Sequence, residues 1–167
     1  SLLPDEINAT ALGLNSELVL LPDASINPLL NIHDHENFVS EVLLPLYNAM
    51  EIETAQDIVS QQERITSRLQ TITLKDLYEY QGYQYLEDRR SHPVTRGAVA
   101  LANSGPNTNG SEFFISLNNA QWLNGKHTVI GAVVDGMDVV DNITSTAVNP
   151  MRPSRIATFI YSAEQIN

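Results

Sequence analysis

The segment at residues 97–143 constrains the fold most strongly, because it alternates short strand-forming runs with loops rich in glycine, proline and asparagine. Residues 98–101 form a small apolar run that suits a buried strand. Residues 103–111 then contain Gly105, Pro106 and Gly110 among several asparagines. Because such residues tolerate a positive φ or fix φ, they predict a shaped loop rather than a helix.

A second strand is predicted at residues 112–117, where successive side chains point to opposite faces. One face is apolar and is expected to meet the core: Phe113, Ile115 and Leu117. The other face carries Glu112, Phe114 and Ser116. The ring of Phe114 among polar neighbours has two interpretations, a second buried face or the apolar floor of a pocket at the surface.

The rest of this segment adds a strand, a helix and two recognition candidates. Residues 128–134 favour a β-strand, and Met137, Val140 and Ile143, spaced three apart, predict one face of a short helix. The loop before the strand carries Trp122, the only tryptophan, and His127. From composition alone, these two side chains are either packing residues or part of a recognition site.

Three motifs in this segment resemble the carboxy-terminal half of a cyclophilin, the peptidyl-prolyl cis-trans isomerase family. They are LANSGPNTNGSEFFI at 101–115, WLNGKHTVIG at 122–131 and GMDVV at 136–140. The resemblance implies a mainly β fold, a closed eight-stranded antiparallel barrel with flanking helices. It also implies proline-containing peptides or unfolded protein chains as partners, cyclosporin-type ligands, and no cofactor.

The resemblance assigns site residues position by position. It puts Phe114 on the floor of a proline pocket with Leu123 and His127 beside it, and Trp122 on the rim. Ala102 and Asn103 would line the groove, with the Asn103 main chain pairing to the substrate strand. Glu112 stands where the family usually has glutamine. The glutamate adds an acceptor and removes a donor at this position.

The family's block F-H-R-x-x-x-x-F-M-x-Q-G-G has no clear counterpart here. In one register residues 78–83 stand for its second half, which makes Gln81 a catalytic residue and puts Thr73 at the arginine position. In a rival register residues 82–88 match a later family stretch, and the arginine would lie before residue 76. The arginines available to such a site are Arg64, Arg68, Arg89, Arg90 and Arg96.

Three functional hypotheses follow from this gap. The first is a prolyl isomerase, which is favoured because the pocket residues Phe114, Leu123 and His127 are retained. The second is a module of little catalytic activity that binds proline-containing segments as a scaffold or chaperone. The third is a structural domain whose site is blocked by a helix at residues 51–70.

Bulk properties exclude other classes. A length of 167 residues is expected for one domain, here residues 1–167. The net charge of −11 argues against nucleic acid and anionic membranes as partners. Without cysteine or a run of about 18 apolar residues, neither disulfides nor a membrane span is expected. The protein is expected to be soluble. It would lie in the cytoplasm, or in the periplasm or outside the cell after removal of an upstream segment.

The first 70 residues are predicted as an extended or loosely ordered arm at 1–16, a strand at 17–21 and two helical segments. Asp34 is a candidate N-cap for a helix with an apolar face of Phe38, Val42 and Leu46, which Pro45 would disturb. Residues 51–70 carry a helical apolar stripe without glycine or proline and predict a helical insert. Residues 33–36 contain metal-ligand side chains, but four adjacent residues cannot converge on one ion, so no metal is expected.

Overall fold

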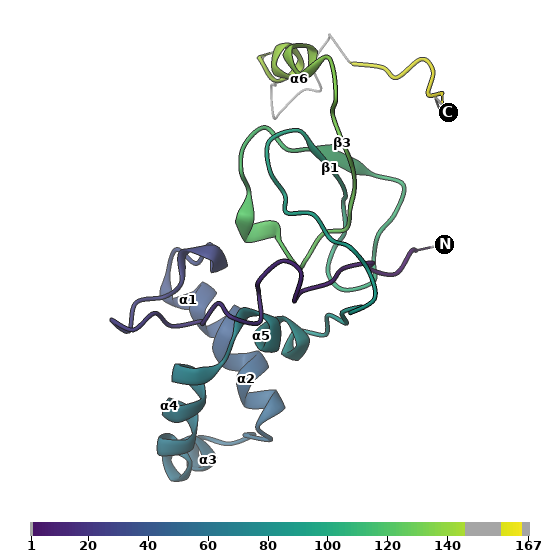
Figure 1. The fold of residues 1–167 in the computed structure, drawn as a ribbon. Helices are drawn as coiled ribbons and strands as arrows, with labels where there is room; N and C mark the ends of the chain where they lie inside the picture. The colour runs from purple at the N-terminus through teal and green to yellow at the C-terminus, as the bar shows by residue number, and fades with distance from the viewer. Residues whose placement is uncertain (1, 146–157, 165–167) are drawn as a thin grey trace, which may run out of the picture.

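Helices fill the first half of the chain and a small sheet lies in the second half (Figure 1). The computed structural model describes residues 2–145 and 158–164. The helical elements are η1 (Pro28–Leu30), α1 (His35–Phe38), η2 (Val39–Leu43), α2 (Leu44–Ala49), α3 (Ala55–Ser60), α4 (Gln62–Thr71), α5 (Leu74–Tyr80), η3 (Gln121–Leu123) and α6 (Met137–Thr144). The strands are β1 (Ala98–Leu101), β2 (Phe113–Ile115) and β3 (Val129–Ala132).

The elements α1, η2 and α2 follow one another without a break. Asp34 caps the start, as predicted, because its side chain accepts a hydrogen bond from the Asn37 N–H at 2.8 Å. Pro45 lacks an N–H and crowds the carbonyl four residues earlier, that of Glu41. The backbone passes this point through the π-helical turn η2, and Gln81 Nε2 donates to the Glu41 carbonyl at 2.7 Å. Pro45 therefore widens the helix instead of ending it.

The helix predicted at 51–70 is present as two helices, α3 and α4, which are separated at Gln61. Thr54 begins α3 with a reciprocal capping box, and Thr73 begins α5 in the same way. The strand predicted at 17–21 is wrong. Leu18 and Leu20 form only isolated bridges, because their partners belong to a helix start and a turn that offer one pairing each.

The sheet has the order β2-β1-β3, and both pairings are antiparallel. Ala100 lies opposite Phe114 in the pairing of β1 with β2, and opposite Val129 in the pairing of β1 with β3. The predicted strand at 98–101 is confirmed. The predicted helix carrying Met137, Val140 and Ile143 is also confirmed as α6.

The prediction of a closed eight-stranded barrel is wrong. Within residues 2–145 and 158–164 the sheet has three strands, and neither β2 nor β3 pairs with a further strand. The physical reason lies in the first 90 residues, where helix caps and a 3.6-residue apolar period replace the two-residue alternation of strands. Without those strands, the sheet cannot close on itself.

The predicted core face of β2 is also wrong. The side chain of Phe113 is exposed, with a relative accessibility of 47%. Phe114 instead packs with Leu123 and Val129 against a small buried cluster of Val94, Ala98 and Ala120. The two faces of a strand are equivalent by period, so the neighbours that cover one of them decide which is buried.

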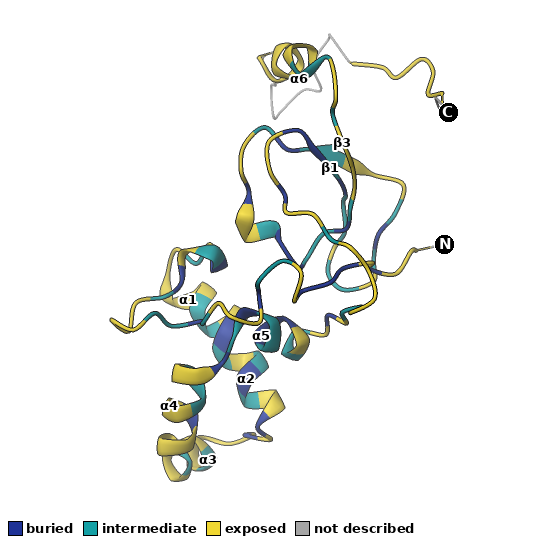
Figure 2. Cartoon of the chain, in the orientation of Figure 1, coloured by how far each residue is buried: buried dark blue, intermediate teal, exposed yellow. Residues whose placement is uncertain are grey.

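The larger of the two buried apolar clusters draws most of its members from residues 17–86, the helical part, and further buried residues lie in the arm and around the sheet (Figure 2). This larger cluster includes Val42, Leu46, Leu74, Leu77 and Tyr78, which are almost fully buried. The arm at residues 2–16 is extended at first; its Ala9 and Leu14 join this cluster, and its Ile7 is also buried. The arm lies between the helices and the sheet (Figure 1).

Two further features concern residues 2–145 and 158–164 only. None of the helices there has the length and apolar character needed to cross a membrane. No three His, Asp or Glu side chains of these residues are grouped closely enough to hold a metal ion.

Candidate functional site

The candidate site is built around the contact between Phe114 on β2 and His127 in the loop before β3. The two rings meet edge to face, with centroids 5.4 Å apart and planes at 86°. His127 Nδ1 lies 3.0 Å from the carbonyl oxygen of Leu101 at the end of β1. Because a carbonyl only accepts, Nδ1 carries the proton in this contact, which orients the ring and leaves Nε2 as the other polar atom.

Asn103 connects this contact to the neighbouring loop. Its side-chain Nδ2 donates to the Lys126 carbonyl at 2.8 Å, directly before His127. Among the described residues, the N–H and C=O of Asn103 form no hydrogen bond. The Ala102 N–H, in contrast, donates to the Glu112 carbonyl at 2.9 Å and extends the ladder of β1 with β2. The Asn103 main chain is therefore the first position after β1 that can pair with an added strand.

Three further predicted site residues differ in their exposure. Leu123, at the end of η3, is half-buried and packs against the same cluster as Phe114. Trp122 is its neighbour on η3 and is exposed, with a relative accessibility of 40%. Glu112 is exposed just before β2.

Gln81 lies at the end of α5, and its side chain is used by the helical part. Both hydrogen bonds of this side chain go to Glu41, one of them to the carbonyl that would face the missing N–H of Pro45. It also lines a surface hollow of about 440 Å³ with Pro45, Tyr83 and Lys126. The structure thus places Phe114 in contact with His127, packs Phe114 and Leu123 against the same buried cluster, and engages the Gln81 side chain with Glu41.

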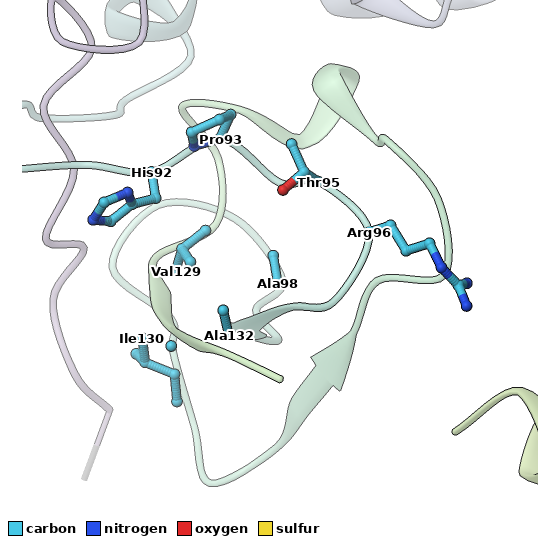
Figure 3. Close-up of a pocket in the computed structure, with 9 residues that line it drawn as sticks. His92, Pro93, Thr95, Arg96, Ala98, Val129, Ile130 and Ala132 are labelled. Atoms are coloured by element: carbon cyan, nitrogen blue, oxygen red, sulfur yellow. The ribbon is translucent and has the colours of Figure 1, made fainter. Parts of the chain in front are cut away.

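A second hollow, of about 400 Å³, opens on the sheet beside this cluster (Figure 3). Ala98 and Val129 line it and also pack in the cluster with Phe114. Phe114 and His127 do not line this hollow themselves. Arg96 lines its edge, but Figure 3 shows the Arg96 side chain directed away from Ala98 and Val129.

Four of the five arginines considered from the sequence form hydrogen bonds outside the candidate site. The partners are Gln61 for Arg64, Asp76 and Tyr80 for Arg68, Glu6 for Arg89, and Asp141 with the Leu117 carbonyl for Arg96. The fifth, Arg90, is exposed. None of the described arginine hydrogen bonds reaches Phe114, Leu123 or His127.

The helical part supports the loop that carries His127, which sequence reasoning missed. Tyr85 donates from its hydroxyl to the Gly125 carbonyl at 2.9 Å, and burial raises the pKa of Tyr85, so the hydroxyl keeps its proton. The ammonium of Lys126 lies 4.6 Å from the ring centroid of Tyr78, and burial lowers the pKa of Lys126 although Glu41 acts in the opposite direction. Nothing in the local sequence signals these contacts, since they join residues about 40 or more positions apart.

Most of the chain, including every residue of the candidate site, matches a known protein family. A family model described as "Cyclophilin type peptidyl-prolyl cis-trans isomerase/CLD" matches residues 34–164. The chain belongs to the cyclophilin family. The predicted family is therefore confirmed, and it is a family described as peptidyl-prolyl cis-trans isomerases. This cyclophilin departs from the predicted architecture in its open sheet and its helical first half.

Two fungal proteins are similar to parts of this chain. The protein named "Peptidyl-prolyl cis-trans isomerase-like 1" of Rhizopus delemar is 61% identical over 44 residues, which are 26% of this chain and 27% of that protein. "Peptidyl-prolyl cis-trans isomerase cyp15" of the same organism is 51% identical over 63 residues, which are 38% of this chain and 10% of that protein. The chain thus spans about a quarter and a tenth of the length of these curated relatives.

Proposed function

We propose that this cyclophilin catalyses the cis-trans isomerisation of X-Pro bonds in peptides and unfolded protein chains. Family membership supports the reaction class. The observation that carries the proposal is the edge-to-face contact of Phe114 with His127, beside Leu123 and next to the unpaired main chain of Asn103. This arrangement offers an apolar surface for a proline ring and a main-chain position for the peptide on either side of it.

The chemistry needs no covalent intermediate. An X-Pro bond isomerises over a barrier of about 18–20 kcal/mol, which comes from lost amide resonance, and unaided exchange takes tens to hundreds of seconds. Phe114 and Leu123 would hold the proline ring while the Asn103 main chain holds the extended peptide. Restraint that favours the twisted amide over both planar forms lowers the barrier, because only interactions stronger in the transition state accelerate the reaction.

The other predicted residues have secondary roles in this proposal. Ala102 lines the groove, Trp122 forms part of its rim, and Glu112 supplies an acceptor for a substrate N–H. Gln81 is assigned by resemblance alone, and its bonds to Glu41 favour a structural role. Residues 1–167 act as one domain, and cyclosporin-type ligands would compete with the peptide for the same surface at Phe114 and His127.

A second function is favoured by the placement of the arginines. An arginine that donates to the proline nitrogen stabilises the twisted amide in this family, and four of the candidates here are engaged elsewhere. A cyclophilin without that donor would bind proline-containing segments with little catalysis, as a scaffold or chaperone.

The third hypothesis, a site blocked by residues 51–70, has no support in the described contacts. The helices α3 and α4 lie at the end of the helical part away from the sheet (Figure 1). The side-chain hydrogen bonds of α4 to other elements go from Arg68 to Asp76 and Tyr80, not to the candidate site.

NMR exchange spectroscopy on a short Ala-Pro peptide tests the proposal directly. The wild-type protein, Phe114→Ala and Phe113→Ala are compared at equal concentrations of folded protein. Phe113 is a matched control, because it is the neighbouring phenylalanine, on the opposite face of β2 and exposed. We expect accelerated exchange with the wild type and with Phe113→Ala, and a loss of at least about tenfold with Phe114→Ala.

Each outcome separates the hypotheses. Shifts of the peptide resonances without faster cis-trans exchange would establish a binding module and overturn the isomerase hypothesis. An equal loss in both phenylalanine variants would place catalysis outside the Phe114 contact. Absence of any peptide shift would overturn both functions.

A further inference from the structure

We infer that Asp5, in the arm that precedes the family match, is a positioning residue for the candidate site. Its carboxylate holds the loop at residues 103–110 and, through that loop, the main chain beside His127. The inference rests on the proposed function and extends it to a residue outside residues 34–164.

Asp5 is tied to the loop through three of its polar atoms. Its Oδ2 accepts from the Asn107 N–H at 2.7 Å, and its Oδ1 accepts from Asn109 Nδ2 at 2.8 Å. The Asp5 N–H donates to Asn107 Oδ1 at 2.9 Å. Both carboxylate oxygens therefore meet donors from one loop more than 100 positions away in the sequence.

A continuous line of hydrogen bonds leads from Asp5 to the peptide group before His127. Asn109 is fully buried, and its Oδ1 accepts from Asn103 Nδ2 at 3.2 Å. The same Asn103 nitrogen donates to the Lys126 carbonyl at 2.8 Å. The line thus passes through Asn103, whose main chain is the position proposed to pair with substrate.

The arm holds the site at two further points. The Leu3 N–H donates to the Asn109 carbonyl at 2.8 Å, and the Glu6 N–H donates to Thr128 Oγ1 at 3.0 Å. Thr128 follows His127 directly and is buried. The arm therefore contacts the loop before β2 and the start of β3, so its position and that of the two site loops are coupled.

The two donors that face position 5 explain why it carries a carboxylate. Asp5 is buried, with a relative accessibility of 5%, and forms no ion pair among the described residues. Burying a carboxylate without a cation is costly, and an amide would cost less. An amide offers one acceptor oxygen, however, whereas two N–H donors converge here, so a carboxylate fits both.

The test compares Asp5→Asn with Asp88→Asn, which makes the same change at an exposed carboxylate. Catalysis of Ala-Pro exchange is measured per folded molecule, so a loss of stability alone does not enter. We expect kcat/KM to fall about tenfold in Asp5→Asn and to stay at the wild-type value in Asp88→Asn, because misplacement of binding groups lowers the rate without removing them.

A double variant that swaps the side chains at positions 5 and 109 shows whether this series of hydrogen bonds causes the loss of activity. Asn109→Asp alone sets two carboxylates against each other and should lose at least as much as Asp5→Asn. In the double variant Asp5→Asn/Asn109→Asp, the amide introduced at position 5 donates to the carboxylate introduced at position 109, which still accepts from Asn103 Nδ2. We expect this variant to recover most of the activity lost in Asp5→Asn.

A second readout does not depend on activity. In ¹H–¹⁵N NMR spectra without peptide, the amide resonances of Asn103 and His127 should shift in Asp5→Asn and keep their positions in Asp88→Asn. If they do not shift, or if the double variant recovers nothing, the inference is overturned. If the wild type fails to accelerate exchange, the proposed function falls, while these resonances still decide the role of Asp5.

Discussion

Replacing Gly125 by alanine tests whether the arm and the helical part together hold the loop that carries His127. Gly125 has a φ of +83°, a conformation that costs a residue with a Cβ about 1–2 kcal/mol. A Cβ there would lie 2.5 Å from Leu14 Cδ1, 3.2 Å from the Tyr85 hydroxyl and 3.3 Å from Tyr78 Cδ2. Overpacking of this kind costs about 1–3 kcal/mol. We expect Gly125→Ala to lower the free energy of unfolding by about 2–5 kcal/mol.

A matched glycine separates the two contributions. Gly136 has a φ of +81°, and a Cβ there would meet no atom within 4 Å. Gly136→Ala should therefore lower the free energy of unfolding only by the backbone contribution, about 1–2 kcal/mol. The difference between the two variants measures the packing of the loop against Leu14 of the arm and against Tyr78 and Tyr85.

Urea unfolding followed by tryptophan fluorescence suits this measurement, because Trp122 is the only tryptophan and lies close to Gly125 in the chain. Leu14→Ala in the Gly125→Ala background removes the closest contact, so the double variant should lose less than the sum of the two single losses. If Gly125→Ala costs no more than Gly136→Ala, the loop does not pack on Leu14 and the support described for the site is wrong.

Three further predictions concern stability. Burial raises the pKa of Tyr83 to about 12 and also raises that of Tyr78 and Tyr85. Unfolded tyrosine ionises near pH 10, so the free energy of unfolding should fall above that pH, by at most about 1.4 kcal/mol per pH unit for each tyrosine. A free energy of unfolding that stays constant from about pH 9 to 12 in urea titrations would contradict this. Burial lowers the pKa of Lys126, so Lys126→Met should raise the free energy of unfolding at pH 7 by about 1 kcal/mol. This gain should shrink as the pH approaches 10.5, and a lower free energy of unfolding measured with urea at neutral pH would refute the prediction. Thr54→Ala removes an N-cap and should cost about 1 kcal/mol by the same assay, and an unchanged midpoint would argue against the cap.

Local chemistry explains what could be predicted from the sequence. Asp34 begins a helix because its side chain accepts from the N–H three residues on, which needs nothing from the rest of the chain. The strand at 98–101 follows from a short apolar run, and the helix α6 follows from apolar residues spaced three apart. The family follows from three ordered motifs, and the family model over residues 34–164 confirms it.

The candidate site was predicted in part. Phe114 and His127 were assigned together by resemblance, and the structure places their rings in contact. Their roles in catalysis stay predictions until the exchange experiment is done. Gln81 could not be placed in this way, since a short motif does not reveal that Gln81 binds the Glu41 carbonyl, four residues before Pro45.

The sequence by itself determined the cap at Asp34, the loop at 103–111, the strand at 98–101, the helix α6 and the family, because these depend on neighbouring residues. Only the tertiary structure decided that Phe114 packs inward while Phe113 is exposed, that the sheet stays open, and that Asp5 reaches the loop at 103–110. The physical reason is the same in each case. Either face of a strand can be buried, a sheet edge can pair with many strands, and a carboxylate can accept from many donors. Which face, strand or donor is used is decided by segments that are distant in sequence and adjacent in space.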